Sequence, residues 1–263
     1  MLIAALGDVH GQWREATALL GTACASAEIA PGNLAAVFQV GDAEPQRDED
    51  EAATVSGPAK YRKLGDFDEV GSGEIVVPAP LYFIAGNHEP FGALDADGGL
   101  VEGGGQWGPN VTYLGRGGLL EIAGLRVGFL SGIYGEGTFR RAQEGVLRFR
   151  TGKHATHYLP CELEIVRSAM AGGVDVLLTH DWPSGIAEDS HFGPVGDERV
   201  RVLIEDCQPI LSLHGHMHRP ASTVIGTTQV ECLAIVGYHS GDPMSAVGIW
   251  DIDPDARTTR RIV

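Results

Sequence analysis

The sequence is poor in cysteine, in positive charge and in long hydrophobic runs. Its four cysteines, Cys24, Cys161, Cys207 and Cys232, lie far apart among 263 residues. Because disulfide frameworks and zinc ribbons need closely paired cysteines, we expect reduced thiols that are mostly buried. No apolar run approaches the roughly 20 residues that cross a bilayer. Since no basic leader precedes the apolar run at residues 2–6, we expect a soluble, cytoplasmic protein.

Lysine and arginine are scarce relative to acidic residues. The chain has 19 Lys and Arg against 35 Asp and Glu, a formal net charge of −16. Proteins that bind nucleic acid over a broad surface use Lys and Arg to displace counterions, so this class is disfavoured. Two basic stretches could attract an anion locally, although solvated surface is the simpler interpretation of both. They comprise Lys60, Arg62 and Lys63, and Arg140, Arg141, Arg148, Arg150 and Lys153.

The composition suits a folded protein with many tight turns. Hydrophobic residues make up 43% and charged residues 21%, so a sizeable core can form without disulfides. Glycine is frequent, with 37 residues, and the clusters at 103–105 and 115–118 separate apolar runs. We therefore expect several strands that are joined by turns.

The order of the apolar segments predicts the fold class. Buried strands are expected at residues 2–6, 34–40, 81–85, 174–178 and 210–213, and helices at residues 12–28, 162–171 and 198–206. Glycine-separated runs at 111–130 indicate hairpins, residues 48–51 an exposed acidic loop, and the C-terminal part further strands. We predict a single α/β domain over residues 1–263, with two packed mixed β-sheets flanked by helices.

Polar residues follow five of the expected strands. The motifs are Gly7-Asp8-Val9-His10, Gly41-Asp42, Gly86-Asn87-His88-Glu89, Thr179-His180-Asp181 and Gly215-His216-Met217-His218. Because loops at the carboxyl ends of the strands converge in α/β sheets, we expect these side chains to meet. Any one motif alone is more often a cap or a surface turn, but five in order, each after a strand, favour one site.

The residue types in these motifs predict a metal centre. Asp, Asn and His provide hard oxygen and borderline nitrogen ligands, a set that suits Mn, Fe or Zn. Seven donors favour two divalent ions roughly 3.5–4 Å apart over one, with Asp42 as the shared carboxylate. The predicted ligands are Asp8, His10, Asp42, Asn87, His180, His216 and His218.

These motifs resemble those of calcineurin-like metallophosphoesterases over nearly the whole chain. The resemblance implies a four-layer sandwich and two ions; Asp8, His10 and His218 hold one, Asn87, His180 and His216 the other, and Asp42 both. It also implies that His88 is not a ligand but contacts the scissile phosphate and protonates the leaving oxygen. Two divalent ions with Asp8 and Asp42 leave a charge of about +2, which can bind a phosphate and acidify a bridging water for in-line attack.

Within that superfamily the chain is most similar to RNA lariat debranching enzymes, which hydrolyse 2′–5′ phosphodiester branches. Matching stretches are Lys60-Tyr61-Arg62, Gly86-Asn87-His88-Glu89, Trp107-Gly108-Pro109-Asn110, Tyr113-Leu114-Gly115, Ser131-Gly132-Ile133 and His180-Asp181-Trp182-Pro183. Residues 135–157 lie where those enzymes carry a branch-recognising loop. Those enzymes have a C-terminal extension and have Cys in place of Asp8. Because a carboxylate is a harder ligand than a thiolate, we expect more tolerance of Mn here.

The leading hypothesis is a metal-dependent phosphodiesterase acting on a nucleotide or short nucleic acid by attack of a metal-bridging hydroxide. The alternatives are a small-molecule phosphomonoesterase or nucleotide pyrophosphatase, and an inactive scaffold of the same fold. Residues 43–47 lack the Asp-Arg-Gly pattern that follows Gly-Asp in protein Ser/Thr phosphatases. No Gly-x-x-x-x-Gly-Lys loop or Gly-x-Ser-x-Gly elbow occurs. We expect no membrane and no obligate protein partner.

Several other residues receive structural interpretations. Glu89 and Asp181 could each orient an imidazole of the site, and His214 is expected to support the site or to lie in the core. The remaining histidines are expected at the surface or in hydrogen bonds, and the tryptophans in the core rather than stacked on a base. These residues are His154, His157, His191 and His239, and Trp13, Trp107 and Trp182.

Overall fold

The computed structural model describes residues 1–56, 62–96, 104–148, 150–189, 193–237 and 241–263. The interpretations of Lys60, Tyr61, His191 and His239 lie outside the described residues. No helix in the described part of the chain has the length and apolar character that a membrane span requires.

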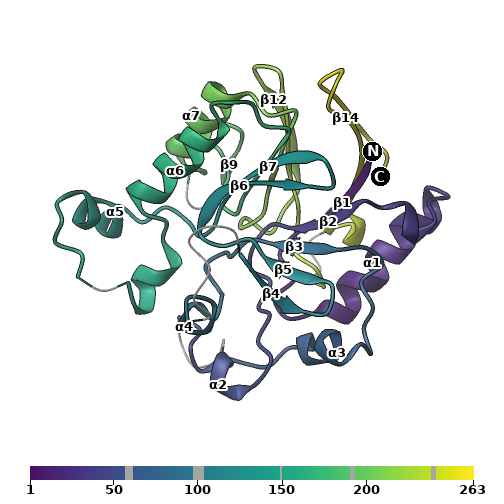
Figure 1. The fold of residues 1–263 in the computed structure, drawn as a ribbon, viewed down its shortest axis with the longest axis horizontal. Coiled ribbons are helices and arrows are strands. Elements are labelled where there is room, and N and C mark those ends of the chain that lie inside the picture. The colour runs from purple at the N-terminus through teal and green to yellow at the C-terminus, as the bar shows by residue number, and fades with distance from the viewer. Residues whose placement is uncertain (57–61, 97–103, 149, 190–192, 238–240) are drawn as a thin grey trace.

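Two mixed β-sheets organise the described residues (Figure 1). The first sheet has the strand order β15-β14-β1-β2-β3-β5-β4, in which β1, β2, β3 and β5 run parallel. Its strands are β1 (Leu2–Leu6), β2 (Ala36–Gln39), β3 (Leu81–Phe83), β4 (Gly105–Gly108), β5 (Val111–Tyr113), β14 (Val247–Asp253) and β15 (Thr258–Arg261).

The second sheet has the strand order β12-β13-β11-β8-β7-β6, in which β7, β8, β11 and β13 run parallel. Its strands are β6 (Gly117–Ile122), β7 (Leu125–Leu130), β8 (Val176–Thr179), β11 (Leu211–His214), β12 (Ala221–Ile225) and β13 (Thr228–Cys232). A separate two-stranded ribbon is formed by β9 (Glu188–Asp189) and β10 (Gly193–Pro194).

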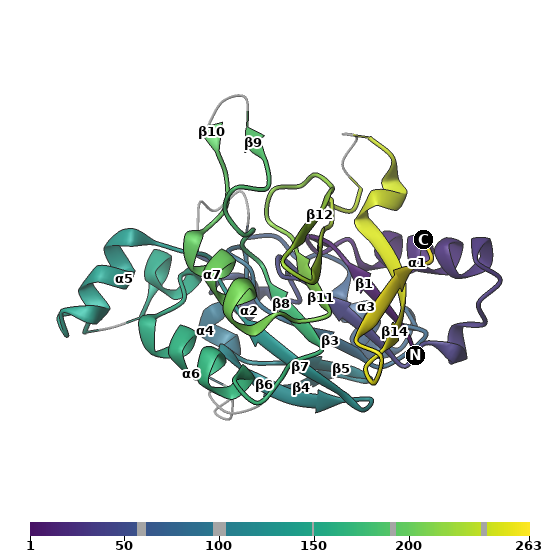
Figure 2. The ribbon, with the colours of Figure 1, turned by 90° about the horizontal axis from the view of Figure 1, so that it is seen from above.

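Helices cover the outer faces of the two sheets. Helix α1 (Trp13–Ser26) packs on the first sheet, and α6 (Pro160–Met170) packs on β6 and β7 of the second. Figure 2 shows α1 and α5 at opposite ends of the molecule. The other helices are α2 (Glu49–Ala52), α3 (Phe67–Ser72), α4 (Phe91–Leu94), α5 (Glu136–Gln143) and α7 (Glu198–Cys207), with 3₁₀ turns at Pro31–Asn33, Gly152–Thr156 and Pro243–Ala246.

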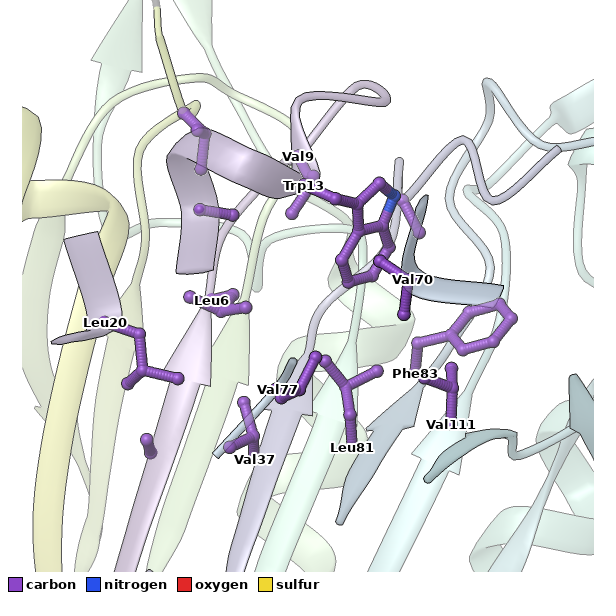
Figure 3. Close-up of a cluster of buried hydrophobic side chains, with 14 of the residues drawn as sticks. Leu6, Val9, Trp13, Leu20, Val37, Val70, Val77, Leu81, Phe83 and Val111 are labelled. Atoms are coloured by element: carbon purple, nitrogen blue, oxygen red, sulfur yellow. The ribbon is translucent and has the colours of Figure 1, made fainter. Parts of the chain in front are cut away.

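Alternating side chains of β1 explain the layers. Ala4 and Leu6 join the cluster beneath α1, whereas Ile3 and Ala5 join the cluster between the sheets, as the two-residue period of a strand requires. Figure 3 shows Leu6 on the α1 side together with apolar residues of the helix and of the neighbouring strands. Each large apolar side chain buried in this way contributes about 1.5–3 kcal/mol. The order helix, sheet, sheet, helix confirms the predicted α/β fold class.

Three local predictions need correction. Residues 48–51 were expected to be a loop, but the Asp48 side chain accepts a hydrogen bond from the Glu51 amide at 2.9 Å and caps α2. Within 111–130 only β6 and β7 pair as a hairpin, because β5 belongs to the other sheet. The four cysteines are free as expected, but Cys161 is exposed and Cys207 is half-buried.

Candidate metal centre

Strands of both sheets deliver the predicted ligands to one place. Asp8 and His10 follow β1, Asp42 follows β2, and Asn87 follows β3 of the first sheet. From the second sheet, His180 follows β8, and His216 and His218 follow β11. These strands are parallel within each sheet, so their carboxyl ends lie on the same side of the molecule.

Four of the predicted ligands form a compact group. One ligand atom from each of Asp8, His10, Asp42 and His218 lies within 4.8 Å of the others. The Nε2 atoms of His10 and His218 are 3.2 Å apart, and His218 Nε2 is 3.3 Å from Asp8 Oδ2. This group is the set that the family resemblance assigns to the first ion, with the shared Asp42.

The other three predicted ligands contact Asp42, Asp8 or one another. His180 Nε2 is 3.3 Å from Asp42 Oδ2, and the rings of His180 and His216 are 5.1 Å apart. The backbone N–H of Asn87 donates to Asp42 Oδ1 at 2.7 Å, and the backbone N–H of His216 donates to both oxygens of Asp8 at 3.0 Å. Atoms of all seven predicted residues therefore lie at this end of the two sheets, and Asp42 contacts residues of both groups.

The chemistry of these donors fits divalent cations. Asn87 Oδ1 is buried, and no donor among the described residues reaches it. His180 Nδ1 lies 2.8 Å from the Val40 carbonyl, which can only accept, so Nδ1 carries a hydrogen and Nε2 is the nitrogen left to bind a metal ion. An unmatched amide oxygen, imidazole lone pairs and two buried carboxylates all become satisfied when cations occupy the space between them.

The pKa values of the buried carboxylates show the same preference for positive charge. Burial raises the pKa of Asp8 to about 7 against the opposing effect of His180. Burial lowers the pKa of His180, but Asp42 and Asp8 outweigh it and the pKa rises to about 10. For Asp42, His180 outweighs the effect of burial and holds the pKa well below its ordinary value. Two carboxylates buried this close together favour the binding of positive charge between them.

Several residues at the centre have a left-handed backbone conformation. His10, Asp42, Glu44, His216 and His218 have positive φ angles between 46° and 72°, a region that costs on the order of 1–3 kcal/mol for non-glycine residues. Such strain persists only when surrounding contacts fix the backbone. Here the strained residues lie in the loops after β1, β2 and β11, which carry candidate ligands.

Two glycines allow the loops to approach each other. A Cβ atom on Gly86 would lie 2.2 Å from Asp42 Oδ1, and a Cβ atom on Gly215 would lie 2.2 Å from Asp8 Oδ1. Both distances are far shorter than van der Waals contact. The glycines of the Gly-Asn-His and Gly-His-x-His motifs are therefore required for packing against the carboxylates.

Glu89 does not orient an imidazole, which corrects one interpretation. Its buried carboxylate accepts hydrogen bonds from the amides of Ala43 at 2.7 Å, Glu44 at 3.0 Å and Gly86 at 3.3 Å. Burial and the Asp42 charge raise its pKa to about 8. Asp181 likewise accepts from a backbone amide, that of Tyr134, at 2.9 Å. Both acids fix loops around the centre.

The other interpreted residues lie in the core or in local hydrogen bonds. His214 is fully buried between Thr179 and Ser212, and burial lowers its pKa to about 4. His154 and His157 both contact the Thr138 hydroxyl at 2.7 Å. Trp13, Trp107 and Trp182 are buried, as expected.

Glu44 is not among the predicted site residues. Its Oε1 lies 2.7 Å from His10 Nδ1, on the side of the ring opposite to the candidate metal position. With His10 and His88 it forms a second group of closely spaced ligand atoms. The only available signal was its position two residues after Asp42.

A cleft of about 790 Å³ opens beside the centre. His88 and the basic residue Lys63 line this cleft together with His10 and His218. The lining residues are His10, Gly11, Gln12, Glu44, Lys63, Leu64, Gly65, His88, His218 and Ile235. Of the two basic stretches, the first therefore contributes a residue to this cleft, whereas Arg140 and Arg141 belong to α5.

Two facing mixed sheets with Asp, Asn and His side chains gathered at their strand ends define a calcineurin-like phosphoesterase. The profile of the Calcineurin-like phosphoesterase family matches residues 1–220, and the chain belongs to that family. The crystal structure of TT1561 of Thermus thermophilus shares the fold, with a TM-score of 0.56 and 13% identity over 99% of this chain and 97% of that chain.

Within the family, the chain is similar to lariat debranching enzymes. It is 30% identical to that of Caenorhabditis briggsae over 82% of this chain and 46% of the relative. It is 28% identical to the Homo sapiens enzyme over 83% of this chain and 42% of the relative. The chain thus spans less than half the length of these relatives. The predicted family resemblance is confirmed.

Proposed function

We propose that this chain is a binuclear metal-dependent phosphodiesterase that hydrolyses a nucleotide or short nucleic acid, with a 2′–5′ linkage as the leading candidate. The observation that supports the proposal is the gathering of candidate ligands from both sheets, with Asp42 Oδ2 near imidazoles of both groups. An inactive scaffold has no need of an intact ligand set. It also gains nothing from strained backbone at these positions.

The seven residues fit two divalent ions. Asp8, His10 and His218 would hold one ion, Asn87, His180 and His216 the other, and Asp42 both. The mixed oxygen and nitrogen set favours Mn, with Fe and Zn as alternatives. Bound ions would neutralise the phosphoryl oxygens and supply an acidified water as nucleophile.

The proposed proton donor to the leaving oxygen is His88. Its ring lies 5.2 Å from the His10 ring and lines the cleft, while its amide donates to Asp42 Oδ1 at 2.8 Å. The backbone is thus fixed to the bridging carboxylate, and the imidazole faces the space where a substrate would lie. From there His88 can contact the scissile phosphate and give a proton to the leaving oxygen.

The cleft and the relatives support the substrate class. A volume of about 790 Å³ lies within the range of small-molecule sites, and Lys63 adds a cation to the lining of the cleft. The similar proteins are lariat debranching enzymes by name. A nucleotide or nucleic-acid substrate would be met in the cytoplasm, which stays the expected location.

The test compares three substrates with Mn-loaded protein: a generic aryl phosphodiester, the matching aryl phosphomonoester and a 2′–5′ dinucleotide. A 3′–5′ dinucleotide of the same bases is the control for linkage. We expect the two diesters to be hydrolysed faster than the monoester, and the 2′–5′ linkage faster than the 3′–5′ linkage. Preference for the monoester would overturn the proposal in favour of a phosphomonoesterase.

A further inference from the structure

Glu44 makes a directed contact with a candidate metal ligand. Its Oε1 atom lies 2.7 Å from His10 Nδ1, while Nε2 of the same ring points to His218 Nε2 at 3.2 Å. The exposed fractions of the two side chains are only 16% for His10 and 13% for Glu44. Partial burial and short distance separate this pair from the exposed ion pairs that contribute little.

The backbone around Glu44 is built to hold this contact. Asp42 and Glu44 both have left-handed φ angles, of 52° and 46°. Glu89 binds the amides of Ala43 and Glu44 with its two carboxylate oxygens at 2.7 Å and 3.0 Å. The three-residue turn therefore sends Asp42 toward the centre and Glu44 toward the outer nitrogen of His10.

An ionised carboxylate can only accept a hydrogen bond, so His10 Nδ1 must carry the hydrogen. The Nε2 lone pair then lies on the side of the ring that faces His218 and Asp42. Carboxylates bound to the outer nitrogen of a ligand histidine fix its tautomer and ring orientation and raise its basicity.

We propose that Glu44 is a positioning residue for the metal ion assigned to Asp8, His10 and His218. It holds His10 in the tautomer that presents Nε2 and adds one negative charge to the centre. With ions of +4, Asp8 and Asp42 at −2 and Glu44 at −1, the net charge becomes about +1 rather than about +2. The inference rests on the proposed metal centre but not on the substrate.

The experiment measures Mn²⁺ binding to metal-stripped protein by isothermal titration calorimetry. The variants are Glu44→Ala, Glu44→Gln and a matched control, Glu49→Ala, which removes an exposed carboxylate from the neighbouring helix α2. Far-UV circular dichroism establishes that each variant is folded. The isosteric Glu44→Gln variant carries the test if Glu44→Ala does not fold.

We expect the wild type and Glu49→Ala to bind two ions alike. Glu44→Ala should weaken one of the two sites by about 10–100-fold, the usual effect of losing such a partner. Glu44→Gln should weaken that site less, because its amide oxygen still accepts from Nδ1. The calorimetric readout is independent of turnover.

Two results would contradict the role of Glu44. Wild-type affinity in Glu44→Ala shows that the contact does not matter for metal binding. Equal loss in Glu44→Ala and Glu44→Gln indicates that Glu44 is itself a ligand, alongside His10 and His88. Absence of Mn²⁺ binding in the wild type would instead remove the proposed function and this inference together, so the two failures are distinguishable.

Discussion

At the scale of single residues, the centre depends on two carboxylates with different surroundings. Asp42 receives the amides of Asn87 and His88 on one oxygen and faces His10 and His180 with the other. Asp8 is equally buried but contacts His216 and His218. Because Asp42 is the ligand proposed to be shared by both ions, its loss should affect more of the centre than the loss of a ligand to one ion.

Metal stoichiometry tests this asymmetry. Asp42→Asn keeps the shape of the side chain but removes the central charge, and we expect bound Mn to fall from two ions to fewer than about one per chain. Asn87→Ala removes a neutral ligand on one side only, and we expect about one ion to remain. Elemental analysis after gel filtration measures both. Equal losses in the two variants would contradict a bridging role for Asp42.

The role of His88 makes a second prediction at this scale. His88→Ala should lower kcat by about 10²–10⁴-fold, the usual contribution of a general acid, because it removes the proton donor. Bound metal should stay unchanged, since His88 is not a predicted ligand. Steady-state kinetics measures kcat, and elemental analysis of the same sample measures the bound metal. An unchanged kcat would show that another group protonates the leaving oxygen.

The candidate ligands can be proposed from the sequence because they lie in motifs directly after apolar strands. Glu44 could not be predicted, because a lone glutamate in an acidic loop has no distinguishing pattern. Glu89 was assigned the wrong contact for a related reason. Adjacent residues in a turn point in different directions, and only the backbone angles decide which direction each takes.

At the scale of elements, the segment before α3 is joined to α1. Asp66 accepts hydrogen bonds from the amides of Trp13 and Arg14, the first two residues of α1, while Gln12 makes no side-chain cap. The Asp66 amide donates to the Gly11 carbonyl at 2.9 Å. The cap of one helix therefore also fixes the residues that place Lys63 on the cleft.

Removal of this cap should affect stability and substrate binding together. Asp66→Ala should lower the free energy of unfolding by about 0.5–2 kcal/mol, as for other lost helix caps. It should also raise KM with little change in kcat, because Lys63 loses its fixed position. Urea titration and kinetics test both, with the exposed Asp68→Ala as control. A stability loss without a change in KM would separate the cap from the cleft.

A second element-scale prediction concerns the segment that contains α5. His157 contacts the Thr138 hydroxyl, and burial together with Lys153 and His154 lowers its pKa from 6.5 to about 4. The unfolded chain therefore binds a proton below about pH 6.5 that the folded protein accepts only near pH 4. The stability associated with neutral His157 is complete above pH 6.5 and is lost as the pH falls toward 4.

The comparison uses His157→Asn, whose amide can still contact Thr138. We expect the wild type to lose more stability than the variant between about pH 7.5 and about pH 5, as measured by urea unfolding at each pH. The difference isolates His157 from the other histidines. Parallel losses in the two proteins would show that His157 titrates normally.

Most elements were predictable because their apolar periods are clear, as in β1 and α1. Helix α2 was not, because its residues are mostly acidic and its formation depends on the Asp48 cap. That β5 and β6 belong to different sheets could not be predicted either, since both strands are short apolar runs. Each of them pairs with a strand that is adjacent in the sequence, β5 with β4 and β6 with β7, so the local pattern does not show that the two hairpins belong to different sheets.

At the scale of the whole molecule, the ligands come from both sheets, so metal binding should stabilise the entire fold. A ligand at 100 times its Kd adds about 2.7 kcal/mol to the free energy of unfolding. For a chain of this size that corresponds to a rise in Tm of about 5–10 °C. Calorimetric melts with Mn²⁺ and after chelation measure the effect. Identical melting temperatures would contradict a centre that joins the two sheets.

The layered architecture could be predicted from alternating strands and helices, but the contacts between strands of the two facing sheets could not. Which strands face each other depends on contacts such as those of Phe38 and Phe129, which join one cluster between the sheets. These residues are distant in the sequence and carry no pattern that links them. The extent of one domain over residues 1–263 stays a prediction.

The close approach of Gly86 to Asp42 and of Gly215 to Asp8 has a consequence for variation in this protein. Any side chain at either position displaces a carboxylate, although neither glycine is a predicted ligand. A saturation library read out by activity would therefore tolerate these two positions as poorly as the ligands themselves. Function in this chain therefore depends on the absence of a Cβ atom at these two glycines as much as on the side chains proposed to bind metal.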